Sequence, residues 1–598
     1  APGQAPKQMT QRKPPPDDGS PLQMWWYPAQ RRPDNTLYLL GKHLNPLGVF
    51  FWGRKEEIKD PYLLLEAPKG VAVRGPVVRG RSPLPDAVDV RPEPVERDGR
   101  RLLRWRLPLP LEPLLMGLKL DGPNWTEYHY VYVEPEESCP AEFSWRWQLE
   151  VAGNPGPVHE IPARVVTPVG GALAPVPGFD LYAQHSGALR YPSAEGRAQV
   201  LDYLAYAGIR GGLSLTHYQP EYVDIDRELN QAGFFTWAWH WDGYGGRGEA
   251  DQRLVYQDGT TATGLLCPQF EAERGEPWFS DLVSLYRSRL ATGLKTIIIN
   301  YEPPYLNCCY CARCRSAFAR FAGLDEAKVA SMTPAEIRAL PDNAWGRFRS
   351  EQNGRIVKNH VAALRQVASN IRVGICGPPY HPSVADSGMD IRLFEPDVAI
   401  HAPMIYTVGL PYEQMIRSTC EGTTSMVLPF LLVSDVVVGD PFPLPEDVRV
   451  NMLATALSGA RGAFLWVGIE ALDGQYLQAL RQSMEEIRLL EPYILDGTRD
   501  SEVRVEASPG RSRLVRVGDK EIRVTEENPV TAVRTWTWRS SRGRLLGLIN
   551  YDRETAHQVG VLAEGVTEAK TLYGPAPKVA EKRFLIELAP YQAAAYVW

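Results

Sequence analysis

The stretch Thr296-Ile-Ile-Ile-Asn-Tyr-Glu-Pro-Pro304 decides how we interpret this chain. Its apolar, β-branched run is typical of a buried strand, and two prolines end strand geometry abruptly. Glu302 stands at the carboxyl end of that run, directly before the prolines. In a parallel barrel the carboxyl ends of the strands carry the chemistry. We therefore interpret the stretch as a barrel strand that delivers a carboxylate to an active site.

Seven further apolar runs flank this stretch between residues 176 and 497, and helical spacing separates them. The predicted strands are Phe179–Gln184, Gly212–His217, Phe234–His240, Thr296–Glu302, Ile371–Cys376, Val398–Tyr406, Ser425–Asp435 and Gly462–Val467. The clearest predicted helices are Glu195–Ala207, Trp278–Ala291, Phe348–Ala368, Pro445–Leu457 and Tyr476–Leu490. Strands and helices that alternate in this way predict a (β/α)8 barrel, an α/β fold.

The segments outside the barrel do not show this alternation of strands and helices. Residues 1–20 are rich in proline and polar side chains, which predicts disorder. Residues 21–175 and 498–598 consist of short β-like runs interrupted by proline and glycine, which is typical of all-β sandwiches. A chain of 598 residues is too long for one core. We expect a barrel at 176–497 between two β-sandwich domains.

The composition narrows the range of partners. The chain has 65 basic and 71 acidic residues and a net charge of −6, which disfavours nucleic acid. Its 16 Trp and 27 Tyr favour a carbohydrate ligand, because sugar rings pack against aromatic faces. No run reaches the roughly 18 to 20 apolar residues that a membrane helix needs. Because the chain begins with Ala1, we expect a mature secreted or periplasmic protein. A homo-oligomer is possible.

Polar and aromatic residues gather where the predicted strands end. These residues are His217, His240, Asp242, Asn300, Glu302, Tyr406, Asp435, Trp466 and Glu470. Glu302 is placed to protonate a leaving group as a general acid/base. Asp435 is the predicted second carboxylate, with Asp242 and Glu470 as competitors. A separation of about 5 Å between the two carboxyl groups would imply retention of anomeric configuration, and about 6.5 to 9.5 Å inversion.

The other rim residues would bind the substrate. Strand alternation puts Asn300 and Glu302 on one face, so Asn300 would lie beside the acid. We expect Asn300, Tyr406 and His240 to contact hydroxyls, and Trp466 and Trp241 to stack on a sugar ring. On strand three we expect Trp237 and Trp239 to fill the layer between barrel and helices, with His240 and Asp242 on the opposite face.

Four of the eight cysteines lie within Cys308–Cys314. The spacing Cys309-x-Cys311-x-x-Cys314 brings three thiolates close enough to share one metal ion. Tetrahedral zinc needs a fourth ligand, for which Cys267 is well placed and Cys308 is the local alternative. A site of four thiolates would be structural. One or two disulfides are the other interpretation, although three cysteines this close cannot all pair without strain.

Residues 267–318 resemble the glycoside hydrolase family 42 β-galactosidases. The resemblance consists of Asn300-Tyr-Glu302, the Cys309-Tyr-Cys-Ala-Arg-Cys314 run, Phe318 and the upstream Cys267-Pro. It implies a retaining barrel enzyme with its acid/base glutamate on strand four, its nucleophile on strand seven and zinc on the cysteines. The chain departs from that family in three ways: Tyr301 separates the asparagine from the glutamate, strand seven offers Asp435 or Asp440, and a β domain precedes the barrel.

A second, shorter pattern is similar to the chitinase-like family 18 barrels. It consists of Asn300-Tyr-Glu302, Met404-Ile-Tyr406 and Trp466 on strands four, six and eight. In that family the acid glutamate ends strand four in an Asp-x-Glu pair, and the substrate acetamide assists the reaction. Asn300 in place of Asp weakens the charge that such assistance needs.

The sequence thus predicts a glycoside hydrolase that cleaves terminal sugars from oligo- or polysaccharides, with Glu302 as acid/base. It predicts a structural zinc ion and no organic cofactor. A substrate-assisted N-acetylhexosaminidase-like enzyme is the first alternative. The second alternative is a carbohydrate-binding barrel that has lost catalysis.

Overall fold

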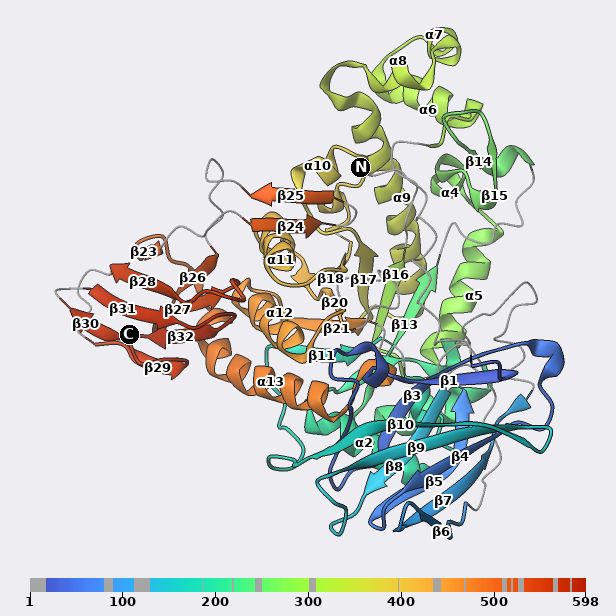
Figure 1. The fold of residues 1–598 in the computed structure, drawn as a ribbon. Helices are drawn as coiled ribbons and strands as arrows, with labels where there is room; N and C mark the ends of the chain where they lie inside the picture. Colours follow the sequence, from blue (N-terminus) through green and yellow to red (C-terminus); the bar gives the residue numbers. More distant parts are fainter. Residues whose placement is uncertain are drawn as a thin grey trace.

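The computed structural model describes most of the chain, in fifteen segments. These are residues 18–79, 90–111, 129–184, 186–217, 220–241, 250–300, 308–395, 397–433, 442–466, 469–507, 513–517, 520–524, 532–562, 568–580 and 583–598. Figure 1 shows a central barrel with β-sheets on two sides of it. Across these segments, no helix is both long and apolar enough to cross a membrane.

The described strands at the centre form a closed parallel barrel of eight strands, which confirms the predicted fold class. In chain order they are β11 (Asp180–Ala183), β12 (Gly211–Leu213), β13 (Phe235–Trp241), β16 (Thr296–Asn300), β17 (Arg372–Gly377), β18 (Ile400–Ile405), β19 (Met426–Val427) with β20 (Phe430–Leu432), and β21 (Gly462–Trp466). β21 pairs in parallel with β11, Gly462 opposite Asp180, and this pairing closes the ring.

Helices surround the ring. They are α2 (Ala194–Tyr206), α3 (Val223–Gln231), α5 (Trp278–Leu290), α9 (Ala344–Val367), the four-residue α10 (Pro382–Ala385), α11 (Leu410–Gly422), α12 (Pro445–Leu457) and α13 (Gly474–Ile494). α2 shows how the sequence specifies them. Ser193 caps its first turn by accepting a hydrogen bond from the Gly196 amide, and Val200, Tyr203 and Leu204 bury one face.

The two faces of each barrel strand pack differently. One apolar cluster fills the lumen, with Trp237, Trp239 and Ile298 among its members. Another lies between β13, β16, β17 and the helices α5 and α9, and it contains Ala238 and Ile299. The prediction that Trp237 and Trp239 fill the layer between barrel and helices is therefore wrong. Parallel strands are apolar on both faces, so alternation does not reveal which face turns inward.

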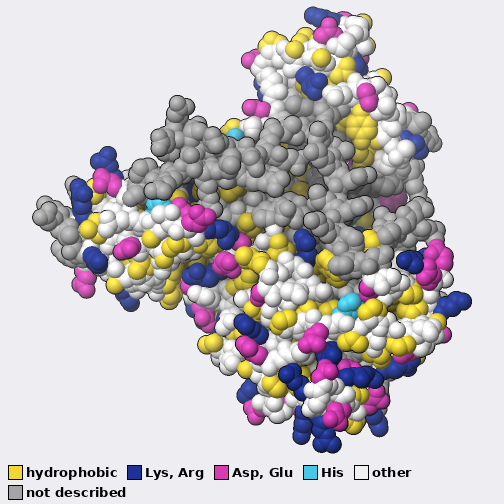
Figure 2. All heavy atoms as spheres, viewed as in Figure 1, with side chains coloured by type: hydrophobic (Ala, Val, Ile, Leu, Met, Phe, Trp, Pro, Cys, Tyr) yellow, Lys and Arg dark blue, Asp and Glu magenta, His cyan; other side chains and the backbone are white. Residues whose placement is uncertain are grey.

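Two sheets precede the barrel. One has the order β1 (Leu22–Tyr27), β3 (Asn45–Gly53), β8 (His129–Pro135) and β5 (Val71–Arg79). The other has the order β2 (Leu37–Leu40), β10 (Asn154–Val166), β9 (Glu142–Val151), β4 (Tyr62–Ala67), β7 (Arg100–Pro108) and β6 (Glu93–Arg97). Trp26 and Trp145 join them edge to face, with ring centroids 5.4 Å apart. The outward surface of this region mixes basic and acidic side chains (Figure 2).

The first of these sheets also contacts the carboxyl end of the barrel. The hydroxyl of Tyr132 on β8 donates to the carbonyl of Ala188, in the 3-10 turn η3 (Gly187–Leu189) that follows β11. The ring of Tyr27 on β1 lies 6.3 Å from that of Phe442, which follows strand seven in the chain. β1 and β8 therefore border the end of the barrel where the candidate residues were predicted.

Further β structure follows the barrel. One sheet has the order β22 (Thr498–Arg499), β26 (Val533–Ser540), β27 (Gly543–Asn550), β32 (Ala593–Val597) and β29 (Lys570–Tyr573), and another β23 (Arg504–Ala507), β28 (His557–Leu562), β31 (Arg583–Leu588) and β30 (Lys578–Ala580). β24 (Arg513–Val517) pairs antiparallel with β25 (Lys520–Val524). The indole nitrogen of Trp538 donates to the Leu457 carbonyl at the end of α12, and this bond ties β26 to the barrel.

Candidate functional site

β16 brings Asn300 to the carboxyl end of the lumen. Ile298 belongs to the lumen cluster, whereas Ile297 and Ile299 pack toward the helices, so Asn300 continues the inward face. Its side chain is fully buried, and its backbone pairs with Trp241 on β13 and Cys376 on β17. Glu302, two positions farther along, lies outside the described residues.

An aromatic pair lies at the same end of the lumen. Trp466 is the last residue of β21 and Tyr406 follows β18, and their ring centroids are 4.8 Å apart. Trp239 and Phe430 hold the Trp466 ring edge-on at 5.8 and 5.6 Å. The buried indole nitrogen of Trp466 has no hydrogen-bond partner in the part of the chain that the structure describes. We call these two residues the Tyr406–Trp466 pair.

Gln184 is a polar residue of this end that the sequence analysis did not select. It follows β11 and is almost fully buried, and its backbone N–H donates to the Leu465 carbonyl on β21. Tyr182, two residues earlier, belongs to the lumen cluster, so alternation puts Gln184 on the inward face. Its side-chain oxygen has no partner among the described residues. The sequence offered only a polar residue at the end of a predicted strand, without showing which way its side chain faces.

His240 does not face the lumen, so the prediction that it contacts a sugar hydroxyl is wrong. Its ring lies 5.2 Å from that of Tyr286 on α5 and 5.0 Å from that of His360 on α9. Arg289 of α5 lies 3.4 Å from its Nδ1 and also donates to the Trp239 carbonyl. Trp237 and Trp239 occupy the lumen face of β13. This polar cluster therefore packs against the helix side of the end of β13.

Several predicted residues cannot be compared with the structure. The carboxylates of Glu302, Asp435 and Asp242 lie outside the described residues. The backbones of His217, Trp241 and Glu470 are described, but their side chains are not. The last three stand in the turn η4 (Leu215–His217), at the end of β13 and in the turn η9 (Ile469–Ala471), all at the carboxyl end of the barrel. Their roles stay predictions.

The loops after strands three and four form a small module. It contains the hairpin of β14 (Arg253–Val255) and β15 (Thr261–Leu266) and the helices α4 (Pro268–Glu273), α6 (Ala312–Ala322), α7 (Glu326–Ser331) and α8 (Pro334–Arg338). Figure 1 shows these elements standing together above the barrel around the start of α9. Phe318, Trp345 and Phe348 are in its core, together with the buried cysteines.

The module brings together the four cysteines that the sequence predicted as metal ligands. The sulfur atoms of Cys267, Cys309, Cys311 and Cys314 all lie within 4.8 Å of one another. Cys267 lies 3.4 Å from both Cys311 and Cys314. Tetrahedral coordination with metal–sulfur bonds of about 2.3 Å would separate the sulfurs by about 3.8 Å. The four thiols could therefore hold one metal ion.

Donors around the sulfurs suit thiolates. The Val255 amide donates to Cys309 at 3.3 Å, and the Cys314 amide donates to Cys311 at 3.4 Å. Hydrogen bonds from Cys267 and the other two cysteines lower the pKa of the Cys311 thiol, whereas hydrogen bonding with Cys309 raises the pKa of Cys267 and burial raises that of Cys314. Cys308, the alternative fourth ligand, stays outside the cluster, and burial raises the pKa of its thiol to about 12. All eight cysteines are described and none of them forms a disulfide in the structure.

Comparisons with known proteins find similar solved structures at low sequence identity. No family description and no curated protein matches the sequence. The family 39 glycoside hydrolase of Bacteroides cellulosilyticus WH2 is similar over 94% of this chain and 98% of its own, at 9% identity and a TM-score of 0.38. The β-galactosidases of Marinomonas ef1 and Halorubrum lacusprofundi are similar over 52% of this chain and 60% and 57% of theirs, at 10% and 13% identity and TM-scores of 0.41 and 0.39. These values assign the chain to none of those families.

Proposed function

We propose that this chain is a glycoside hydrolase that cleaves terminal sugars from oligo- or polysaccharides, with Glu302 as the general acid/base. The observation that carries the proposal is the position of Asn300. Because Asn300 is fully buried on the inward face at the end of β16, continued strand geometry would direct the side chain two positions later into the same space. A carboxyl group there would protonate a leaving-group oxygen.

The Tyr406–Trp466 pair supports a sugar as the ligand. Aromatic rings present an apolar face on which the C–H side of a pyranose packs, and indole and phenol groups add hydrogen-bonding atoms. The Trp466 indole N–H, which lacks a partner in the described part of the chain, would donate to a sugar hydroxyl. Gln184, whose side-chain oxygen also lacks a described partner, would accept from a second hydroxyl. Trp241 and His217 stay predicted contacts at the same end.

The second carboxylate of the proposed mechanism is Asp435, with Asp242 and Glu470 as competitors. In a retaining reaction it would attack the anomeric carbon while Glu302 protonates the leaving oxygen, and water would then release the sugar. In an inverting reaction it would instead activate water on the opposite face of the ring. Proton NMR of the first-formed anomer distinguishes the two outcomes.

A substrate-assisted reaction is the second candidate, because the buried Asn300 amide would also suit a sugar acetamide. In that case only substrates with an N-acetyl group at C2 would be cleaved. Loss of activity when that acetamide is replaced by hydroxyl would favour this candidate over the two-carboxylate reaction.

The test is a set of aryl glycosides that differ in sugar and anomer. We expect phenol release from at least one of them, and we expect Glu302→Gln to lower kcat/KM about 10³-fold or more while the thermal midpoint persists. Glu351→Gln, on an exposed part of α9, is the matched control and should keep full activity. Turnover near the wild-type value in Glu302→Gln contradicts the assignment. Binding of sugars without any phenol release supports the non-catalytic barrel.

We further propose that the four cysteines hold a structural zinc ion. Four thiolates are a donor set that zinc prefers, and a closed tetrahedral site leaves no position for water. The ion would supply a cross-link between the loops after strands three and four and would take no part in the reaction. Elemental analysis should find about one zinc per chain, and Cys311→Ser should lose it and destabilise the module. Cys139→Ser, outside the cluster, should keep it. Purified protein without zinc but with full stability contradicts this proposal.

Export to the periplasm or the medium is part of the proposal and rests on the sequence alone. We also propose that the chain assembles into a homo-oligomer. Cell fractionation tests the first, and light scattering on the purified chain tests the second.

A further inference from the structure

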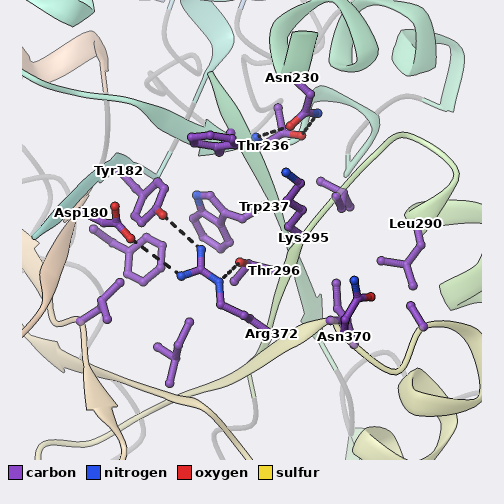
Figure 3. Close-up of a pocket in the computed structure, with 17 residues that line it drawn as sticks. Asp180, Tyr182, Asn230, Thr236, Trp237, Leu290, Lys295, Thr296, Asn370 and Arg372 are labelled. Carbon is purple, nitrogen blue, oxygen red and sulfur yellow. Dashed lines mark hydrogen bonds and ion pairs between the residues drawn. The ribbon is translucent and has the colours of Figure 1, made fainter. Parts of the chain in front are cut away.

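A cavity of about 530 Å³ opens at the amino ends of the barrel strands, opposite the end that carries Asn300. It lies where β11, β13, β16 and β17 begin, and Figure 3 shows side chains from these strands converging on it. Its volume falls within the range of small-molecule sites, roughly 300 to 1,000 Å³. The proposed function does not use this cavity.

Two cations from neighbouring strands border the cavity. Arg372 begins β17 and pairs with Thr296 at the start of β16, which Lys295 directly precedes. In Figure 3 the side chains of both cations extend into the cavity. Adjacent strands thus hold an ammonium and a guanidinium group on one side of the cavity.

Arg372 is oriented by its neighbours but keeps donors to spare. Its Nε donates to the Thr296 hydroxyl at 3.2 Å and its Nη2 to the Tyr182 hydroxyl at 3.3 Å. These bonds use two of the five guanidinium N–H groups. The nearest carboxylate oxygen of Asp180 is 3.8 Å from Nη1, which is too long for a hydrogen bond. The pre-oriented guanidinium therefore offers further N–H groups to a ligand.

The charge of Lys295 is less neutralised than that of Arg372. Its amine lies 5.5 Å from the centre of the Phe235 ring, and no carboxylate within the described segments forms an ion pair with it. Against these two cations, Asp180 is the one carboxylate among the described residues that line the cavity. The local charge is therefore positive.

The remaining walls are largely apolar. The side chains of Phe235, Leu290, Leu294, Ile371 and Phe464 line the cavity between the polar groups. An apolar wall beside two cations suits a ligand with a flat apolar body and one acidic group.

We propose that this cavity binds small organic anions, with a carboxylate held between Arg372 and Lys295 and an apolar body against the Phe235 side. Guanidinium groups favour carboxylates because two parallel N–H groups match the two oxygens. Asp180 opposes binding, since it places a negative charge near the same guanidinium group.

The probe is benzoate, titrated calorimetrically into the full chain, with benzamide as the neutral isostere and inorganic phosphate as an anion without an apolar body. We expect millimolar benzoate binding, at least tenfold weaker binding of benzamide, and weaker binding of phosphate. Equal binding of benzamide overturns the role of charge, and equal binding of phosphate overturns the role of the apolar wall. No benzoate binding up to about 20 mM overturns the proposal, because that limit lies above the expected millimolar range.

Two substitutions, one that removes a positive charge and one that removes a negative charge, test whether benzoate binds in this cavity. Lys295→Gln should weaken benzoate binding about fivefold, and Asp180→Asn should strengthen it about threefold, because each changes the charge beside the carboxylate. Lys328→Gln, an exposed lysine on α7, is the matched control and should leave the affinity unchanged. Circular dichroism verifies that each variant is folded. If neither Lys295→Gln nor Asp180→Asn changes the affinity, benzoate binds elsewhere and the proposal is overturned.

Discussion

The two faces of the barrel strands differ in what their polar residues do. On β18, Ile400 and Ala402 face the lumen, whereas the buried His401 alternates to the opposite face. On β13 the lumen face carries Trp237 and Trp239, and His240 lies among helix residues. The helix side thus contains both of these histidines, each enclosed by protein.

The lumen face carries a different set. Phe464 contacts Trp237, which leads through Trp239 to Trp466 at the carboxyl end, with ring centroids 4.8, 5.9 and 5.8 Å apart. Asn300 adds an amide at that end. On β13, the helices α5 and α9 enclose the helix face, so we expect sugar contacts at the carboxyl end of the barrel to come from lumen-face residues. Each prediction below sets one face against the other.

The largest expected effect concerns stability and comes from His401, on the helix side. Its Nε2 donates to the Pro378 carbonyl at 3.2 Å, and burial lowers the pKa of its imidazole to about 4. An unfolded chain has a histidine pKa near 6.5, so below about pH 6.5 the unfolded state binds a proton that the folded state does not. Stability therefore falls as the pH falls, by about 2 kcal/mol at pH 5 and by about 3 kcal/mol below pH 4.

His401→Gln should remove this dependence, because glutamine keeps a donor for Pro378 but does not titrate. Urea unfolding of both proteins at about pH 7.5, 6 and 5 measures it. The free-energy difference between wild type and variant should shrink or change sign as the pH falls, since only the wild type loses stability through this group. Parallel pH profiles for the two proteins would show that His401 is solvated and that the helix face is not sealed.

The next effect concerns activity and comes from Asn300 on the lumen face. Under the proposed function, Asn300→Ala removes a hydrogen-bonding group beside the acid, which should lower kcat/KM about 100-fold. Ile299→Val is the matched control: it is the preceding residue, on the helix face, and should cost about 1 kcal/mol of stability without changing kcat/KM. Steady-state kinetics and thermal unfolding separate the two outcomes. Equal losses of kcat/KM in both variants would contradict the distinction between the faces.

The arrangement of the barrel was predictable because its strands are long apolar runs between helices. The helix predicted over Pro445–Leu457 has those bounds in the structure, and α2 begins one residue before its predicted start. Strand seven differs, because the predicted run Ser425–Asp435 contains Pro429, which has no amide hydrogen to donate. The structure divides that run into β19 and β20 around Leu428 and Pro429.

Strand two was predicted too long. Its end at His217 falls in a 3-10 turn, because the buried carboxylate of Asp226 accepts hydrogen bonds from the amides of Leu215 and Thr216 and bends the chain away after Leu213. That carboxylate comes from α3, and sequence periodicity does not reveal such a tertiary contact.

The metal ligands of the candidate site were predictable because most of them are close together in the sequence. The residues that face the lumen were not predictable, because the sequence does not show which side of a strand turns inward. Three of the cysteines stand within six residues, and Cys267 joins them because β15 ends at Leu266 and α4 begins at Pro268. The inward side of β13 was not predictable, because both of its faces are buried and both carry large or polar residues. Gln184 was missed for the same reason, since only the ring closure shows which way the end of β11 faces.

The smallest expected effect compares two half-buried tryptophans. Trp466 lies in the lumen against Tyr406, and Trp278 lies in the helix layer with its ring 5.7 Å from that of His360. Both would lose similar apolar area as leucine, so their stability losses should be comparable. Only Trp466→Leu should raise KM, by about tenfold, because it alone removes a stacking face for the sugar. Equal KM values in the two variants would mean that the Tyr406–Trp466 pair only fills the lumen, and the sugar platform would then have to be sought at Trp241.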